Sequence, residues 1–128
     1  MKYFEIKCSR CGSRFPYTVP FNICSCCGGA LLLNYNFSVI CDKFISRSIF
    51  KERFDSFWKF FEFLPISSSS DIVSLGELYT PIMNFSKSNS CGFKHVFVKD
   101  DGRLPTGTFK ARGMSVAVSI LRELGVGR

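Results

Sequence analysis

Two cysteine knuckles near the N-terminus constrain the fold of this chain more than any other feature of its sequence. Each has the form C-x-x-C-G, and they read Cys8-Ser9-Arg10-Cys11-Gly12 and Cys24-Ser25-Cys26-Cys27-Gly28. The spacing lets two thiolates reach one ion, and the glycine that follows can turn its backbone N–H toward a sulfur because no side chain obstructs it. Four thiolates form a closed tetrahedral site of the kind that suits Zn²⁺. The pattern predicts a small β ribbon organised by a metal.

The expected metal ligands are the outer cysteines of each knuckle, namely Cys8, Cys11, Cys24 and Cys27. Cys26 could replace either cysteine of the second knuckle, but the Gly28-Gly29 pair that follows favours the outer two. Zinc is favoured over a rubredoxin-like iron, because nothing else in the sequence suggests electron transfer. Since four protein ligands leave no open position, the expected role of the metal is structural.

The composition favours a cytoplasmic protein whose seven cysteines serve a metal rather than disulfides. Glu5 and Lys7 stand where a signal peptide would need an apolar stretch, and no apolar run approaches the ~20 residues of a membrane helix. Cys41 and Cys91 have no paired spacing, so we expect them to be buried as small hydrophobic side chains. The net charge of +7 comes from scattered basic residues, which favours a solvated surface over a nucleic-acid interface.

Hydrophobic periodicity and turn residues predict an α/β chain with a small β ribbon in front. The expected parts are a zinc-ribbon-like module at 1–36, an aromatic helical connector with a Ser-rich linker at 37–70, and the first elements of an α/β domain at 71–128. Strands are expected beside both knuckles and at 72–75 and 94–99, helices at 43–63 and 108–124, and a linker at 67–71. The aromatic stripe of the first helix predicts core packing, with base stacking as the sharper alternative.

The last predicted helix carries one lysine with special chemistry. Its apolar face is expected at Met114, Val118, Leu121 and Leu124. Thr106 or Thr108 could cap its start, and Gly125 is placed to cap its end. Lys110 is expected in the first turn, where the positive end of the helix dipole would disfavour the charged ammonium form. A lysine of lowered pKa can attack an aldehyde, although most lysines at helix starts are solvated surface residues.

A resemblance to a known family gives this lysine a sharper interpretation. The segment Pro105-Thr106-Gly107-Thr108-Phe109-Lys110-Ala111-Arg112-Gly113 resembles the P-T-G-[ST]-F-K-x-R-G signature of threonine synthase and its fold-type-II relatives, which depend on pyridoxal 5′-phosphate (PLP). Other segments resemble the family in the same order: the ribbon, Phe57-Trp58-Lys59-Phe60 before Leu64-Pro65, the segment from Val73 to Ile82, and Glu123-Leu124-Gly125.

The resemblance implies roles for two residues and a reaction for the complete enzyme. Lys110 would be the Schiff-base lysine that binds PLP, and Phe109 would lie against the cofactor ring. The implied reaction converts O-phosphohomoserine and water to threonine and phosphate, so the substrate partner would be a phosphorylated amino acid. Relatives with this signature also dehydrate serine or threonine or form cysteate, so the motif does not settle the substrate.

Two departures from the family shape the functional expectation. Leu78 stands where the family usually has glycine, which puts the turn around it in doubt. The chain ends at Arg128, before the family's Gly-rich phosphate loop. We therefore expect an incomplete PLP-enzyme domain at 71–128 that is inactive as an isolated chain and would need a complementing chain.

Two other functions stay open at this point. One is a zinc-ribbon module that binds nucleic acid or protein, and the other is a non-functional remnant of the enzyme. Nucleic acid is disfavoured, because the sequence has neither the usual aromatic RNA-binding signature nor a basic recognition helix.

Overall fold

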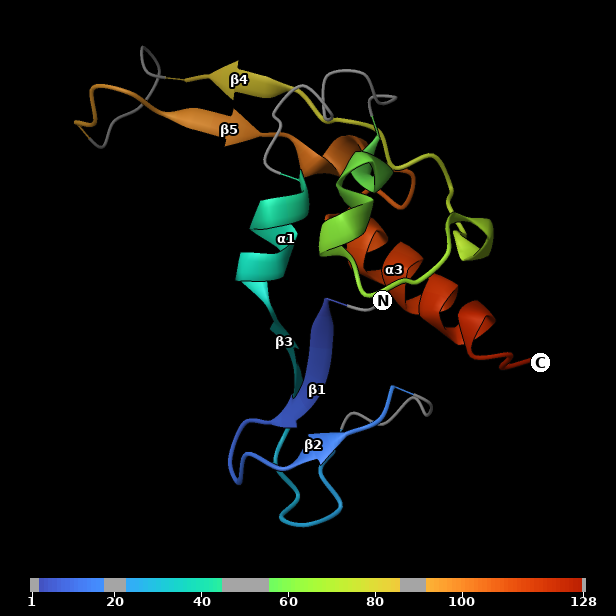
Figure 1. Cartoon of the computed structure of the whole chain (residues 1–128). Helices are drawn as coiled ribbons and strands as arrows, with labels where there is room; N and C mark the ends of the chain where they lie inside the picture. Colours follow the sequence, from blue (N-terminus) through green and yellow to red (C-terminus); the bar gives the residue numbers. More distant parts are fainter. Residues whose placement is uncertain (1–2, 18–22, 45–55, 86–91, 128) are drawn as a thin grey trace.

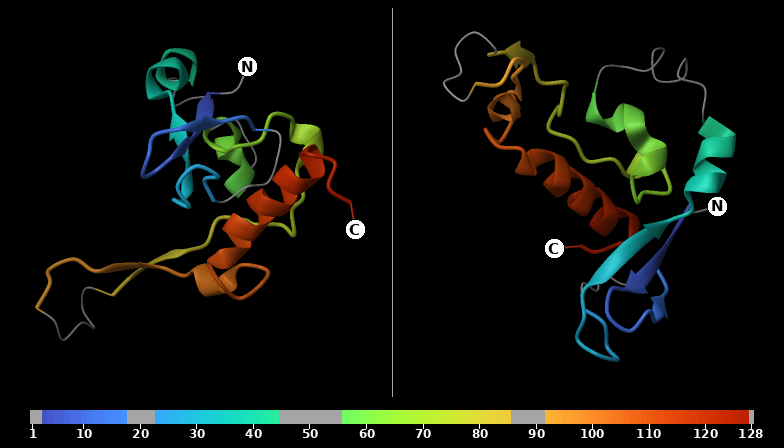
Figure 2. Two further views of the ribbon diagram at one scale, coloured as in Figure 1. Left: turned by 90° about the horizontal axis from the view of Figure 1, so that it is seen from below. Right: turned by 90° about the vertical axis from the view of Figure 1, so that its left-hand side faces the viewer.

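The structure is a computed structural model that describes residues 3–17, 23–44, 56–85 and 92–127. A β ribbon lies at one end of the molecule and a two-stranded hairpin at the other, with helix α3 and the short helices between them (Figures 1 and 2). Within the described residues, no helix is long and apolar enough to cross a membrane. The three-part division of the chain stays a prediction.

The ribbon is a three-stranded antiparallel sheet in the order β2-β1-β3, with β1 at Phe4–Cys8, β2 at Arg14–Phe15 and β3 at Leu31–Tyr35. Its register pairs Cys8 with Leu31, so the first knuckle follows directly from the central strand. Phe4 packs between two tyrosines, with ring centroids 5.2 Å from Tyr17 and 5.7 Å from Tyr35. These strands confirm the prediction of short strands beside the knuckles.

Helix α1, at Phe37–Phe44, follows the ribbon directly and was not predicted. The Asn36 side chain accepts a hydrogen bond from the backbone N–H of Val39 at 3.3 Å, as a helix cap does. Ile40 is buried and anchors the helix. The helix predicted at 43–63 is therefore wrong at its start, because the local cap at Asn36 begins a helix earlier in the chain.

The aromatic segment forms a 3₁₀ helix, η1, at Phe57–Phe63 rather than the end of a long α-helix. Ser56 caps it by accepting a hydrogen bond from the N–H of Trp58 at 3.1 Å, and Phe60 departs from helical geometry. None of its side chains is fully buried, so the predicted core role holds only for a half-buried stripe. The predicted helical residues 45–55 lie outside the described residues.

The serine-rich stretch is packed rather than a free linker. It contains a short 3₁₀ helix, η2, at Ser69–Asp71 that Ser68 caps through the N–H of Ser70 at 3.2 Å. The N–H of Ser67 donates to the Glu123 carboxylate at 3.0 Å, which attaches the stretch to the end of α3. Residues 72–75 form no strand, and the backbone N–H and carbonyl of Val73 bond to serine side chains of α3 instead.

The hairpin pairs β4 at Ile82–Asn84 with β5 at Phe97–Lys99 in antiparallel register. The strand predicted at 94–99 is thus shorter than expected, and β4 was not predicted. Ile82 and Phe97 are 67% and 62% exposed. A 3₁₀ turn, η3, at Asp101–Arg103 then leads toward the lysine segment.

Helix α3, at Lys110–Glu123, confirms the last predicted helix to within two residues. Gly125 ends it with φ of 70°, and its N–H bonds to the Arg122 carbonyl at 3.0 Å while the N–H of Val126 bonds to the Leu121 carbonyl at 2.9 Å. This pair of bonds is a Schellman cap, as predicted at Gly125. The predicted threonine cap is wrong, because the N-cap position is Phe109 and no side chain caps it.

The buried face of α3 also differs from the prediction. Met114 and Val118 are 58% and 41% exposed, whereas Ala111, Ser115 and Ser119 are buried. The serine hydroxyls satisfy the backbone of the segment that crosses the helix, which an apolar face cannot do. In the described residues, the segment 71–128 amounts to this helix, the hairpin and their connections, so its assignment to an incomplete PLP-enzyme domain stays a prediction.

Candidate metal centre and cofactor lysine

The two cysteine knuckles have the same backbone geometry. In each one the N–H of the first cysteine bonds to the carbonyl five residues later, at 2.8 Å from Cys8 to Ser13 and 2.8 Å from Cys24 to Gly29. The glycine after each knuckle has a positive φ, 74° at Gly12 and 68° at Gly28. Its N–H bonds to the carbonyl of the first cysteine rather than to a sulfur, which corrects the expectation from the sequence.

These turns bring the four expected sulfurs together. Cys8 Sγ lies 3.5 Å from Cys27 Sγ, and Cys11 Sγ lies 3.7 Å from Cys24 Sγ. All four ligand atoms lie within 4.8 Å of one another. Four sulfurs held about 2.3 Å from a tetrahedral Zn²⁺ would be about 3.8 Å apart, so the quartet fits this ion. A disulfide would require about 2.05 Å, and the four cysteines are free.

Hydrogen bonds and burial act on the thiols in opposite directions. The N–H groups of Cys11 and Arg10 point at Cys8 Sγ, at 3.5 and 3.3 Å, and lower the pKa of Cys8. A hydrogen bond with Ser13 lowers the pKa of Cys11 to about 6, whereas burial raises the pKa of Cys24 to about 12. A bound metal would remove the proton of Cys24, because a coordinating thiol is deprotonated.

Gly29 is needed for the close approach of the knuckles. A Cβ at this buried position would lie 3.0 Å from both the Cys8 sulfur and the Arg10 side chain. Any larger residue would therefore push the first knuckle away from the second. The Gly28-Gly29 pair thus has two separate functions, a left-handed turn and a close packing contact.

The remaining cysteines lie apart from the quartet. Cys26 is exposed and is not among the clustered sulfurs, which supports the choice of Cys24 and Cys27. Cys41 is also exposed, so the prediction that it is buried is wrong: it follows Ile40, which takes the inward position on α1. Cys91 lies outside the described residues.

The second predicted site is the lysine segment that leads into α3. Lys110 is the first residue of α3, and its side chain is exposed. Phe109, just before it, is 68% exposed. Gly107 takes a positive φ of 67° in the loop that leads to the helix. The structure therefore presents the amine and the neighbouring ring together at the start of a helix.

The segment that contains Leu78 forms a turn around a buried carboxylate. Glu77 is 1% exposed, and its carboxylate accepts hydrogen bonds from the Ser74 hydroxyl and, at 3.1 Å, from the N–H of Leu75. Burial alone would raise the pKa of Glu77, but these hydrogen bonds outweigh it and hold the pKa below its usual value. Leu78 is 49% exposed, so the surface accommodates the side chain that departs from the family pattern.

This segment is tied to α3 through the buried serines. The N–H of Val73 donates to the Ser119 hydroxyl at 2.8 Å, and the Ser115 hydroxyl donates to the Val73 carbonyl at 2.7 Å. Sequence reasoning missed these residues, because serines on a helix usually indicate the side that faces water. The signal available was their spacing of four residues, which places Ala111, Ser115 and Ser119 on one stripe of small side chains.

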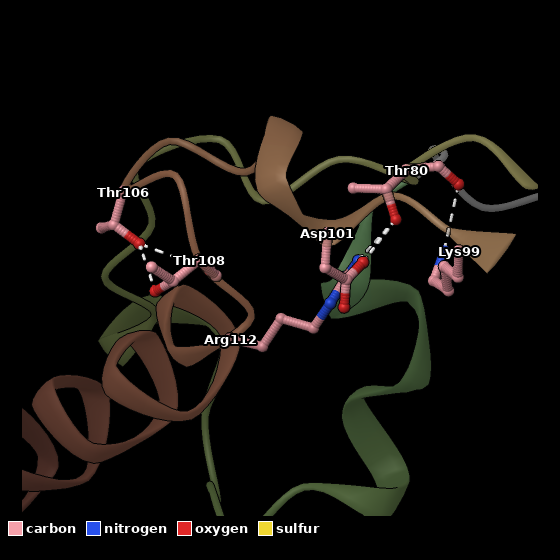
Figure 3. A network of polar contacts seen from close by, with 6 residues as sticks. All are labelled: Thr80, Lys99, Asp101, Thr106, Thr108 and Arg112. Carbon is pink, nitrogen blue, oxygen red and sulfur yellow. Dashed lines mark hydrogen bonds and ion pairs between the residues drawn. The ribbon is translucent and has the colours of Figure 1, made fainter.

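A second polar contact holds the start of α3, and sequence reasoning missed it as well. Arg112 of α3 forms an ion pair with Asp101 of η3 at 3.1 Å, and the Thr80 hydroxyl donates to the same carboxylate oxygen at 2.5 Å (Figure 3). Hydrogen bonds from Thr80 and Arg112 lower the pKa of Asp101. The segment with Thr80, the turn η3 and the first turn of α3 thus meet at one polar contact.

Comparison with curated proteins gives several threonine synthases as relatives. The chain is 39% identical to the threonine synthase of Methanocaldococcus jannaschii over 121 residues, which is 94% of this chain and 29% of the relative. It is 33% identical to that of Methanosarcina acetivorans over 124 residues, 96% of this chain and 29% of the relative. A threonine synthase of Halalkalibacterium halodurans is 42% identical over 65 residues, 50% of this chain and 18% of the relative.

The chain thus spans about three tenths of the length of the first two of these relatives. No family model and no solved structure matches it. The ordered motifs and the extent of these similarities agree. The chain belongs to the threonine synthase family.

Proposed function

We propose that this chain contributes the cofactor lysine, Lys110, to a threonine-synthase-like enzyme that uses PLP. The observation that carries the proposal is the position of Lys110 in the first turn of α3, exposed and next to the exposed ring of Phe109. The similarity to threonine synthases supports it, since it runs through 94% and 96% of the chain.

The surroundings of Lys110 fit PLP as a ligand. An accessible ε-amine is the group that binds an aldehyde. Apart from its chain neighbours, Gly107 has no atom within 4 Å of the place where a Cβ would stand, so the loop before the helix is open on that side. When bound, PLP supplies an electron sink for charge that develops on the substrate. The part of Lys110 is to hold the cofactor and then to carry a proton at Nζ.

For the whole protein, the proposed reaction converts O-phosphohomoserine and water to threonine and phosphate. Its substrate partner is then a phosphorylated amino acid. This choice follows from the family alone, because the residues around Lys110 do not distinguish between amino-acid substrates.

The proposal also assigns a structural Zn²⁺ to Cys8, Cys11, Cys24 and Cys27. Their sulfur–sulfur separations and their all-thiolate chemistry support zinc. A site with four protein ligands has no position for a substrate, so the ion would stabilise the ribbon and take no part in the reaction.

The 128 residues alone are proposed not to turn over substrate. Because Lys110 and Phe109 are exposed, water would reach a cofactor bound there. Additional protein, from a longer chain or from a complementing one, would have to cover both residues. Supplying the missing part of a threonine synthase in trans is the corresponding gain-of-activity experiment.

Trapping the cofactor tests the role of Lys110. The chain is incubated with PLP, reduced with borohydride, and digested so that mass spectrometry locates the modified lysines. We expect Lys110 to be modified ahead of exposed lysines such as Lys94. Lys110→Ala should remove the main adduct, and Lys94→Ala should leave it. Equal modification of all exposed lysines would contradict the proposal.

A further inference from the structure

Three residues that are distant in sequence form one closed polar contact under the start of α3. The guanidinium of Arg112 contacts Asp101 Oδ1 at 3.1 Å and the Thr80 hydroxyl oxygen at 3.4 Å, and that hydroxyl donates to Asp101 Oδ1 at 2.5 Å (Figure 3). The Thr80 carbonyl accepts from Lys99 Nζ at 3.1 Å. The Thr80 hydroxyl thus serves both partners of the ion pair at once. We call Thr80, Asp101 and Arg112 the clamp.

The clamp is more shielded from water than an ordinary surface ion pair. The side chains of Arg112 and Asp101 are 18% and 26% exposed, and Thr80 is 7% exposed. The guanidinium also lies 5.8 Å from the ring centroid of Phe57. Exposed ion pairs contribute little to stability, but a shielded and hydrogen-bonded pair is held in one geometry.

Helix geometry connects the clamp to Lys110. Residues two positions apart on an α-helix project about 200° from each other, so they lie on opposite sides. Arg112 is held inward by the clamp, and Lys110 is exposed on the outer side. A contact that prevents the first turn from rotating about the helix axis therefore also determines where Lys110 points.

The usual means of holding a helix start is missing at this site. No side chain caps the N-terminus of α3, and the hydroxyls of Thr106 and Thr108 lie 3.4 Å from each other instead. The first backbone bonds are long, at 3.2 Å from Ala111 to Thr108 and 3.3 Å from Arg112 to Phe109. An absent cap costs a helix about 1 kcal/mol, so the first turn depends on another restraint.

We infer that Arg112, held by Asp101 and Thr80, is the positioning residue that orients Lys110. The clamp replaces a helix cap and fixes the rotation of the first turn. The inference rests on the proposed role of Lys110 only for its functional meaning. Its structural content, an ordered first turn that depends on Arg112, can be measured without any cofactor.

The experiment compares the clamp with a matched ion pair on the same 3₁₀ turn. Arg103 and Asp100 form a pair at 2.9 Å whose arginine is far more exposed than Arg112, with side chains 66% and 30% exposed. The full chain is prepared as wild type, Arg112→Gln, Arg112→Lys, Asp101→Asn and, as control, Arg103→Gln. Each is examined by amide hydrogen exchange and by borohydride trapping with PLP as the probe.

Arg112→Gln and Asp101→Asn should speed exchange of the amides at 111–114, with no change in the Schellman-capped turn at the other end of α3. The share of PLP adduct at Lys110 relative to other lysines should fall about five-fold, the ratio that corresponds to about 1 kcal/mol. Arg112→Lys, which keeps the charge, should restore part of both signals. Arg103→Gln should change neither.

The possible outcomes separate the two claims. If wild type shows no preference for Lys110, the proposed function fails, and the exchange of residues 111–114 still decides the clamp. If Lys110 is preferred and Arg112→Gln leaves exchange and preference unchanged, the clamp is overturned while the function stands. Faster exchange along the whole of α3 would also overturn it, because Arg112 would then support general stability rather than position.

Discussion

The ribbon and the lysine unit are stabilised by different chemistry. The lysine unit is α3 together with the segment 73–80 and η3. Both must hold their structure although few apolar side chains are buried among the described residues. In the ribbon four sulfurs lie together in the turns beyond the strands, and Cys8 and Cys24 are buried. The lysine unit instead buries polar groups that bond to each other, including Glu77 and Ser119 at 1% and 0% exposure.

The difference determines what each region depends on. A cluster of thiols is stabilised by an ion that comes from outside the chain, and without the ion the thiols must stay protonated, because neighbouring thiolates repel each other. Buried polar groups need only partners within the chain, and they are costly when one partner is removed. Changes to metal and changes to polar partners should therefore affect different halves of the molecule.

Removing the metal should have the largest effect. A structural Zn²⁺ contributes about 10–16 kcal/mol of binding free energy in small zinc domains, and most of it is folding free energy. We expect a chelator, or Cys24→Ser, to abolish protection of the amides of β1 and β3, while α3 before its last turn keeps its own. Amide exchange and metal content, one ion per chain, are the measurements.

Cys26→Ser is the matched control for the metal experiment. Its thiol is exposed and apart from the four clustered sulfurs, so metal content and ribbon protection should not change. Loss of the ion in this variant would show that the second knuckle binds through a different pair. Equal loss of protection in α3 would contradict the independence of the two regions.

Removing the buried carboxylate should have the next largest effect, and in the other region. Glu77→Ala leaves the Ser74 hydroxyl and the Leu75 N–H without their acceptor. A hydrogen bond to a charged group contributes roughly 1.5–3 kcal/mol, and two such bonds are lost, so we expect a loss of about 3 kcal/mol in the free energy of unfolding. The N–H of Phe57 bonds to the Glu77 carbonyl at 2.8 Å, so fluorescence of Trp58, the single tryptophan, should report the change.

Glu5→Gln is the control on the ribbon. Glu5 pairs with Arg14 at 3.1 Å on the surface, where the Arg14 side chain is 74% exposed. An exposed pair of this kind contributes ~0–1 kcal/mol. If Glu5→Gln destabilised the chain as much as Glu77→Ala, burial would not be the cause of the difference.

The same contrast explains which features could be predicted from the sequence. The knuckles were predictable because the ligand spacing and the glycines act within a few residues. Helix α3 and its cap at Gly125 were predictable for the same reason. The buried face of α3 was not, since apolar periodicity pointed to Met114 and Val118, while the structure buries serines that bond to a distant backbone.

Residues that act through distant partners could not be found from local patterns. Glu77 is a carboxylate in a serine- and glycine-containing turn, which ordinarily indicates an exposed position. Asp101 and Arg112 are 11 positions apart, and only the fold brings them together. The start of α1 was missed because the Asn36 cap, a local signal, was not weighed against the aromatic stripe further on.

Acid should weaken the lysine unit gradually. The folded pKa values of Glu77 and Asp101 lie below their usual values, so their contribution is present above the unfolded pKa, about 4, and is lost as pH falls through the folded pKa. The loss should be smaller than in Glu77→Ala, because a protonated carboxyl still accepts one hydrogen bond. Urea unfolding followed by Trp58 fluorescence from pH 7 downward measures it.

Substitution identifies the groups behind this acid effect. Glu77→Gln and Asp101→Asn carry no titrating proton, so each should flatten part of the pH dependence below about pH 4.5. Asp71→Asn, a carboxylate change at the end of η2, serves as the comparison variant. An unchanged slope in both of the first two variants would mean that other carboxylates cause the acid effect.

The smallest expected effect is at the junction between the two regions. The Tyr17 hydroxyl donates to the Pro65 carbonyl at 2.6 Å, and Ser67 bonds to Glu123 at the end of α3. Burial and the Glu123 carboxylate raise the pKa of Tyr17, which keeps the hydroxyl protonated as a donor. Tyr17→Phe should cost about 1 kcal/mol, the net contribution of one hydrogen bond.

The junction also tests how separate the two regions are. In wild type, chelation should loosen the last turn of α3 slightly. Phe4 of the ribbon packs on Tyr17, and Tyr17 bonds to Pro65, so disorder in the ribbon should weaken the contacts of residues 65–67. In Tyr17→Phe, chelation should have less effect there, and amide exchange at 120–126 is the measurement. Tyr35→Phe changes a ribbon tyrosine whose ring also packs on Phe4, at 5.7 Å, and should leave the response as in wild type. If Tyr17→Phe responds to chelation as strongly as wild type, the contact at Pro65 does not link the metal centre to the lysine helix.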